Sequence, residues 1–102
     1  MKFVHILLGA VVLVSAPAFA SKELAQKNAC LACHAADKKL VGPAYQEVAK
    51  KYAGQKDAVA ALTKSIKAGG SGKWGPVPMP AQAALSEADA KTLAEWVLAG
   101  AK

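Results

Sequence analysis

Cys30, Cys33 and His34 are the residues in this chain whose types and spacing are best suited to chemistry, and they stand together in the stretch Cys-Leu-Ala-Cys-His. Residues three and four apart share one face of a helical turn, so both sulfurs and the imidazole should point into one small volume. This spacing is the sequence signature of covalent haem attachment. We interpret Cys30 and Cys33 as the thioether residues of a haem c and His34 as its proximal iron ligand.

Three other chemistries use a Cys-x-x-Cys pair and remain open at this point. A redox-active disulfide of the thioredoxin kind normally belongs to a βαβ pattern, and this sequence has no strand pattern. A structural zinc ion usually takes four ligands, whereas the residues after position 20 include only three cysteines and histidines in total. A plain disulfide between Cys30 and Cys33 would close a very short loop and would stabilise the fold little.

Met79 is the candidate for a second iron ligand, because no other histidine or methionine follows His34. A haem iron with an open sixth position binds gases or peroxide, whereas a filled one carries electrons, and Met/His ligation raises the reduction potential. Met79 lies between Pro78 and Pro80, whose rings stiffen the backbone and would hold the sulfur still in both oxidation states. The alternative is that Met79 only packs within a loop.

The first twenty residues are typical of an export signal. Lys2 gives a positive start, a short apolar run follows, and residues 18–20 (Ala-Phe-Ala) fit the A-x-A cleavage pattern. The apolar run is too short to cross a bilayer, which needs about 20 residues, so a cleaved signal peptide is preferred to a membrane anchor. We therefore expect a signal peptide at residues 1–20 and a single domain at residues 21–102.

Lysine makes the expected mature chain basic. The sequence has 13 basic residues, all lysine, and seven acidic ones, so the chain after Lys2 is removed carries a formal charge of +5. An exported protein without arginine is poorly suited to reading nucleic-acid bases. Lysine ammonium groups are better suited to steering a protein toward an acidic protein surface. We expect transient docking on acidic redox partners, with no nucleic-acid binding and no stable membrane insertion.

Apolar periodicity predicts four helices and no strand. Pro43 is favoured near a first helical turn, Ser86 is a preferred N-cap, and Gly69 with Gly70 ends the third helix. A chain of this size has a marginal core of its own, so an enclosed haem would supply the apolar body that it lacks. The predicted helical segments are residues 21–33, 42–54, 56–70 and 86–101.

The stretch before the last helix, residues 69–85, is long for a loop in so small a chain. Loops of this length are either functional or disordered, and Trp74 and Met79 argue for function, because disordered segments rarely carry such residues. The sequence therefore predicts that this loop contributes to the cofactor site.

With the stretches CLACH, VGPAY and KWGPVPMPAQ, the chain resembles the class I c-type cytochromes, and among them the small monohaem cytochromes of the proteobacterial periplasm. The resemblance implies an all-α fold, a single small cytochrome c domain whose helices wrap one covalently bound haem with an exposed edge. It also implies a monomeric, soluble periplasmic electron carrier rather than an enzyme. Implied partners in the respiratory chain are a membrane cytochrome complex and a nitrite reductase, a terminal oxidase or a peroxidase. The alternative is a haem enzyme or gas sensor with a displaceable sixth ligand.

Further site residues come from the same resemblance. Pro43 matches the proline whose carbonyl orients the proximal histidine, and Trp74 matches a tryptophan that hydrogen-bonds a haem propionate. Gln82 stands where relatives often have an asparagine that bonds the methionine sulfur, so a similar bond to the Met79 sulfur is expected. Residue-specific alternatives are a helix-starting role for Pro43 and burial of the Trp74 ring to pin the loop. The chain also lacks the arginine that some relatives place near the propionates.

Overall fold

The computed structural model describes residues 18–102, and residues 1–17, which make up most of the predicted signal peptide, lie outside the described residues. The described chain forms helices α1 (Ala18–Lys27), α2 (Tyr45–Tyr52), α3 (Ala58–Ala68) and α4 (Glu87–Leu98), with a short 3-10 helix η1 (Cys30–Ala32) after α1. Between residues 18 and 102 there is no strand, and only two isolated bridges pair the backbone. The predicted all-α class is confirmed. In the same range, no helix is long and apolar enough to cross a membrane.

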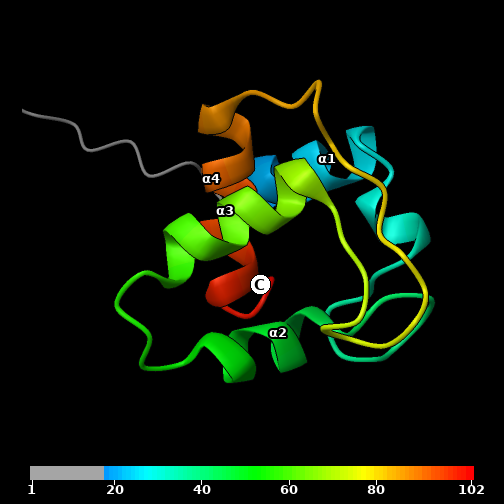
Figure 1. Ribbon diagram of the computed structural model, residues 1–102. Coiled ribbons are helices and arrows are strands. Elements are labelled where there is room, and N and C mark those ends of the chain that lie inside the picture. The colour runs from blue at the N-terminus through cyan, green and yellow to red at the C-terminus, as the bar shows by residue number, and fades with distance from the viewer. Residues whose placement is uncertain (1–17) are drawn as a thin grey trace, which may run out of the picture.

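Helix α4 forms the centre of the core, because it contacts α1, α2 and α3 (Figure 1). Its buried residues recur at helical spacing along one stripe: Ala90, Leu93, Ala94, Trp96 and Val97. The three other helices add small and aromatic side chains to the same cluster, among them Ala25, Tyr45, Val48, Tyr52 and Leu62. The first and last described helices, α1 and α4, pack against each other, and Ala25 of α1 is fully buried.

The prediction of a helix over residues 21–33 is wrong for the second half of this range. Helix α1 ends at Lys27, and Ala29 adopts a left-handed conformation with φ of 59° and ψ of 19°. Asn28 stabilises this end, because its side-chain amide donates to the carbonyl of Leu24 at 2.9 Å. A left-handed residue cannot continue a right-handed helix, so the chain turns and restarts as η1. The cysteines therefore lie on a separate tight turn and not on α1.

Helix α4 begins with a side-chain cap at Ser86, as predicted. The Ser86 hydroxyl accepts a hydrogen bond from the backbone N–H of Asp89 at 3.0 Å, and Glu87 and Asp89 place negative charge in the first turn. This arrangement satisfies one of the free N–H groups at the helix start and complements the helix dipole. The start of the central helix is thus encoded locally.

We expect Ser86→Ala to lower the free energy of unfolding by about 1 kcal/mol, because the N–H of Asp89 loses its partner. Denaturant unfolding followed by circular dichroism measures this difference. The matched control is Ser71→Ala in an exposed loop, which should change stability little. Equal effects of the two substitutions would contradict a capping role for Ser86.

Tyr45, at the start of α2, links the core to the predicted cofactor site. Its ring is 6% exposed, and its edge meets the Trp96 ring of α4 with a centroid distance of 5.4 Å. Burial is the main cause that raises the pKa of the Tyr45 phenol above its ordinary value of 10.0, with smaller contributions from Cys30 and Cys33. The folded protein therefore keeps Tyr45 neutral at pH values where the unfolded chain ionises it.

This pKa shift predicts a loss of stability in alkali. Above the unfolded pKa of about 10 the unfolded chain releases a proton that folded Tyr45 retains, so stability should fall by about 1.4 kcal/mol per pH unit. Unfolding of the wild-type protein and of Tyr45→Phe should be compared from pH 9 to pH 11.5. The stability of the wild type relative to Tyr45→Phe should be constant below about pH 10 and should fall steadily above it. A difference that does not change with pH would contradict the prediction.

Candidate cofactor site

The His34 ring is held in one orientation by two neighbours, Pro43 and Tyr45. Its Nδ1 lies 2.8 Å from the carbonyl oxygen of Pro43, and its ring stacks on Tyr45 with a centroid distance of 5.0 Å and an interplanar angle of 17°. A carbonyl only accepts hydrogen bonds, so Nδ1 carries the ring proton and Nε2 keeps its lone pair. A proton on Nδ1 gives the tautomer that a metal ligand bound through Nε2 requires. Separately, the backbone N–H of His34 donates to the carbonyl of Cys30 at 3.0 Å.

Gly42 is a site residue that the sequence analysis missed. Its N–H donates to the carbonyl of Cys33 at 2.7 Å, which brings its Cα directly against the His34 ring. A Cβ at this position would lie 2.3 Å from Cε1, 2.7 Å from Nδ1 and 2.8 Å from Nε2 of His34. The only signal in the sequence is the Gly-Pro pair. By itself this pair indicates a turn, and it does not indicate a contact with the histidine eight residues earlier.

Cys30 begins η1 and Cys33 follows its last residue, both cysteines are partly exposed, and neither forms a disulfide. In a 3-10 turn, residues three apart lie almost directly above one another, so Cys30 and Cys33 share one side of the turn. Burial is the main cause that raises the pKa of the Cys30 thiol, its backbone hydrogen bond opposes this rise, and Cys33 adds to it. The polypeptide therefore presents a protonated thiol at Cys30 near neutral pH, which is less prone to oxidation than a thiolate.

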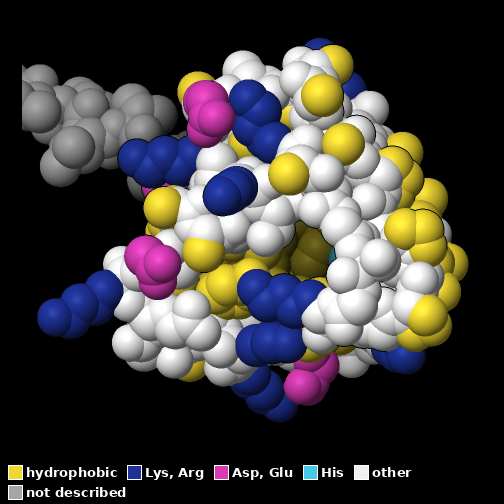
Figure 2. Space-filling view, viewed as in Figure 1, with side chains coloured by type: hydrophobic (Ala, Val, Ile, Leu, Met, Phe, Trp, Pro, Cys, Tyr) yellow, Lys and Arg dark blue, Asp and Glu magenta, His cyan; other side chains and the backbone are white. Residues whose placement is uncertain are grey.

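A hollow opens on one face of the molecule, with hydrophobic side chains on its floor and lysine side chains along part of its rim (Figure 2). Comparison with Figure 1, which has the same viewpoint, places this hollow between α2, α3 and the first part of the loop that follows α3. An apolar hollow of this kind suits a flat, apolar cofactor with a charged edge.

The loop that carries Met79 is fastened to the end of α3. Met79 and Gly70 form an isolated antiparallel bridge, in which the N–H of Met79 donates to Gly70 at 2.8 Å and the N–H of Gly70 donates to Met79 at 3.1 Å. Further along, the N–H of Gln82 donates to the carbonyl of Ile66 at 3.3 Å. The predicted interpretation of the loop as ordered is therefore correct, and the structure supplies hydrogen bonds that the sequence did not predict.

The same loop is also fastened to α2, through two lysines that pack on aromatic rings. Lys51 lies over the Trp74 ring, 4.3 Å from its centroid, and donates to the backbone carbonyl of Lys73 at 3.2 Å. Lys73 lies 4.6 Å from the centroid of the Tyr52 ring and donates to the Tyr52 hydroxyl. The Trp74 ring is 38% exposed, so it pins the loop by contact with Lys51 more than by burial. This corner gathers two ammonium groups beside an indole.

The side-chain amide of Gln82 bonds a backbone carbonyl and not the Met79 sulfur. Its side-chain amide donates to the carbonyl of Pro80 at 3.5 Å, a long contact that leaves the amide free to rotate. The expected bond between Gln82 and the Met79 sulfur stays a prediction.

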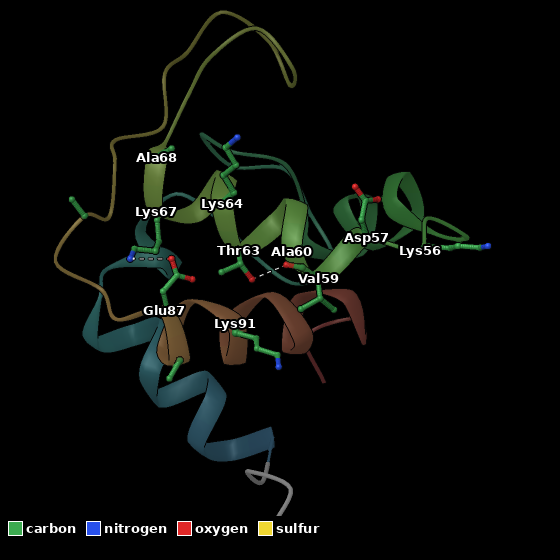
Figure 3. A pocket seen from close by; sticks show the side chains of 12 residues that line it. Lys56, Asp57, Val59, Ala60, Thr63, Lys64, Lys67, Ala68, Glu87 and Lys91 are labelled. Carbon is green, nitrogen blue, oxygen red and sulfur yellow. Dashed lines mark hydrogen bonds and ion pairs between the residues drawn. The ribbon is translucent and has the colours of Figure 1, made fainter.

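A second surface depression lies between α3 and α4 and is lined by none of the predicted site residues (Figure 3). It is a shallow groove with an apolar floor that includes Val59 and Ala60, and its rim carries the ion pair between Lys67 and Glu87 at 3.4 Å. None of its lining residues is a cysteine, a histidine or a methionine. The candidate site is therefore the hollow beside α2 and the long loop.

The arrangement of these groups defines a class of protein. Two thiols on one turn, an imidazole with a fixed tautomer and an apolar hollow in the same domain fit a haem bound through two thioether bonds and one histidine. Zinc would need a further ligand beside these three residues. A helical domain of this kind belongs to the c-type haem proteins.

Comparisons with known proteins agree. The family model described as cytochrome c matches residues 20–101. Cytochrome c-552 of Hydrogenobacter thermophilus is 55% identical over 90% of this chain and 93% of its own length. Cytochrome c-551 of Pseudomonas denitrificans is 57% identical over 76% of this chain and 93% of its own length. The crystal structure of wild-type Nitrosomonas europaea cytochrome c552 has a TM-score of 0.75 and 49% identity, covering 78% of this chain and 98% of that chain.

The chain belongs to the cytochrome c family. It carries one covalently attached haem c, which resolves the alternatives left open for the cysteine pair. Its relatives are electron-carrying cytochromes c-551 and c-552, so the chain is an electron-transfer protein and not an enzyme.

Gly42→Ala should displace the His34 ring, because the added methyl group would overlap three ring atoms. Overpacking of this kind costs about 1–3 kcal/mol, so we expect the unfolding free energy of the haem-loaded protein to fall by that amount. Thermal or denaturant unfolding followed at the haem absorption band measures it. Gly54 has a positive φ of 79°, so an alanine there is strained even in open space, and the reference for this comparison is the wild-type protein. A Gly42→Ala protein that is as stable as the wild type would contradict the crowding.

Proposed function

We propose that this chain is a periplasmic electron carrier whose haem iron is bound by His34 and Met79. When bound, the haem supplies one-electron chemistry between Fe(III) and Fe(II), and the polypeptide supplies two axial ligands and an apolar enclosure. The observation that carries the proposal is the fastening of Met79: both its backbone polar groups are bonded to Gly70, on the loop that borders the hollow. A methionine that served only as loop packing would not require a doubly bonded backbone.

The proximal side of the proposal rests on His34. Pro43 holds the ring proton on Nδ1, so Nε2 is free to bind iron, and the stacked Tyr45 ring limits rotation of the imidazole. The absence of a side chain at Gly42 leaves room for the ring in this position. These contacts keep the ligand in one orientation in both oxidation states, which reduces the rearrangement that accompanies each electron transfer.

The polar edge of the haem is assigned to the corner formed by Trp74, Lys51 and Lys73. We infer that the indole N–H of Trp74 donates to a propionate, and that the two ammonium groups take the place of the arginine found in some relatives. Their positive charges would offset the negative charge of the propionates. Gln82 is proposed as a donor to the Met79 sulfur, which requires its side chain to leave the carbonyl of Pro80.

Location and partners complete the proposal. Residues 1–20 are proposed as a cleaved signal peptide that delivers residues 21–102, a monomeric domain, to the periplasm. Helix α1 begins at Ala18, so the described helix spans the proposed cleavage point. Proposed partners are acidic-surfaced redox proteins, such as a membrane cytochrome complex as donor and a nitrite reductase, an oxidase or a peroxidase as acceptor.

Spectra of the mature protein and of Met79→Ala test the axial ligand. We expect the ferric wild-type protein to show the weak long-wavelength band of iron bound to methionine sulfur, and the reduced protein to leave added CO unbound. Met79→Ala should lose the band and bind one CO per haem. Val77→Ala, an exposed neighbour in the same loop, is the matched control and should behave as wild type. A wild-type protein that lacks the band and binds CO at once would instead support the haem enzyme or gas sensor.

Salt dependence tests the charge steering. With an acidic redox partner, association should slow by about tenfold or more between low ionic strength and 0.15 M salt, because lysine charges are then screened. Stopped-flow reduction measures the rate. Reduction by a small neutral reagent is the control and should not respond to salt. An association rate that is independent of salt would contradict lysine steering.

A further inference from the structure

We propose that Gly69 is a positioning residue for Met79: its missing side chain lets the Met79 backbone bond the end of α3, and this contact sets where the sulfur lies. The inference rests on the proposed Met79 ligation and adds to it the device that holds the ligand in place. Gly69 is ten residues from Met79 in sequence and has no polar side chain, so no motif identifies it.

The backbone of Gly69 has a conformation that only glycine adopts readily. Its φ is 66° and its ψ is −165°, a region in which any Cβ meets the local backbone. Its N–H still closes α3 by donating to the carbonyl of Ser65 at 2.9 Å. The residue therefore ends the helix and at the same time turns the chain toward the loop.

The space beside Gly69 is filled by the backbone of the Met79 segment. A Cβ on Gly69 would lie 2.5 Å from the carbonyl oxygen of Met79, 2.7 Å from the nitrogen of Ala81 and 2.8 Å from the carbonyl carbon of Pro80. These are backbone atoms, which cannot rotate away as the end of a flexible side chain can. A side chain at position 69 would have to push the whole Met79 segment outward.

The next residue completes the contact. Gly70 exchanges two hydrogen bonds with Met79, at 2.8 Å and 3.1 Å. Proline has no backbone N–H, so the N–H of Met79 is the only one between Pro78 and Pro80, and it is used on Gly70. The residue before a proline also favours an extended backbone, which suits this bridge. The prolines therefore stiffen the segment, and the two glycines fasten it to α3.

Gly54 separates this role from ordinary helix termination. It follows the end of α2, has a positive φ of 79°, and has nothing within 4 Å of the position that a Cβ would take. Gly54→Ala therefore introduces backbone strain at a helix end without touching the Met79 segment. It is the matched control for Gly69→Ala.

The experiment compares the mature haem-loaded wild type, Gly69→Ala and Gly54→Ala by the long-wavelength ferric band and by the rate at which added imidazole displaces the sixth ligand. We expect Gly69→Ala to lose most of the band and to bind imidazole faster by about tenfold or more, because the sulfur is displaced. Gly54→Ala should match wild type in both measurements. Equal behaviour of the two variants, whether both normal or both impaired, overturns the inference.

Two further results keep the test decisive. A wild-type protein without the band overturns the Met79 ligation itself, whereas a normal wild type with a normal Gly69→Ala overturns only the role of Gly69. If Gly69→Ala does not yield a haem-loaded protein, amide hydrogen exchange of the wild type decides. The N–H of Met79 should then exchange at least about tenfold more slowly than that of exposed Val77, because it is bonded to Gly70. Equal exchange of the two overturns the inference.

Discussion

The packing of α4 against the other three helices is the interaction on which the rest of this structure depends. Helix α1 connects α4 to the turn that bears the cysteines. Trp96 of α4 contacts Tyr45, whose ring stacks on His34. Helix α3 connects α4 to the glycines to which the Met79 loop is bonded. Each group of the proposed haem site is thus connected to α4 through one intervening helix. The chain is short, so the haem and this helix together provide the apolar body around which it folds.

The two proposed axial ligands are held by different means that share one feature. His34 is a side chain fixed by a hydrogen bond, by stacking and by the crowding of Gly42. Met79 is fixed through its backbone, by neighbouring prolines and by the bridge to Gly70 beside Gly69. In both cases the decisive neighbour is a glycine, because a ligand can be held closely only where no side chain intervenes. Ligands that stay in place reduce the structural rearrangement that accompanies each electron transfer.

The corner of Lys51, Lys73 and Trp74 links the two halves of the site. It joins α2, which orients the histidine side, to the loop that carries Met79, and it collects positive charge next to the hollow. One small surface therefore serves the proposed propionates and also contributes to the basic character of the chain. Because lysine charges are exposed and screened by salt, this part of the structure influences encounter with partners more than folding stability.

Local signals in the sequence determined much of this protein. The spacing of Cys30, Cys33 and His34 indicated the haem, apolar periodicity indicated α2, α3 and α4, and Ser86 indicated the start of α4. These features depend on residues within one or two turns of each other, which is the range over which propensity and periodicity act. The ligand roles of His34 and Met79 come from the same reasoning, the role of Gln82 comes from the resemblance to the class I c-type cytochromes, and all three stay predictions.

Tertiary structure alone decided the features that depend on distant neighbours. The break of α1 at Ala29 overrode a sequence suited to helix, and the contacts of Gly42 with His34 and of Gly69 with Met79 appear only when the chain is folded. A glycine in a sequence indicates freedom of the backbone, but it does not say which atom occupies the space that a side chain would take. That atom is supplied by another segment, so the sequence by itself specified the chemistry of the site, and the fold decided how closely its groups are held.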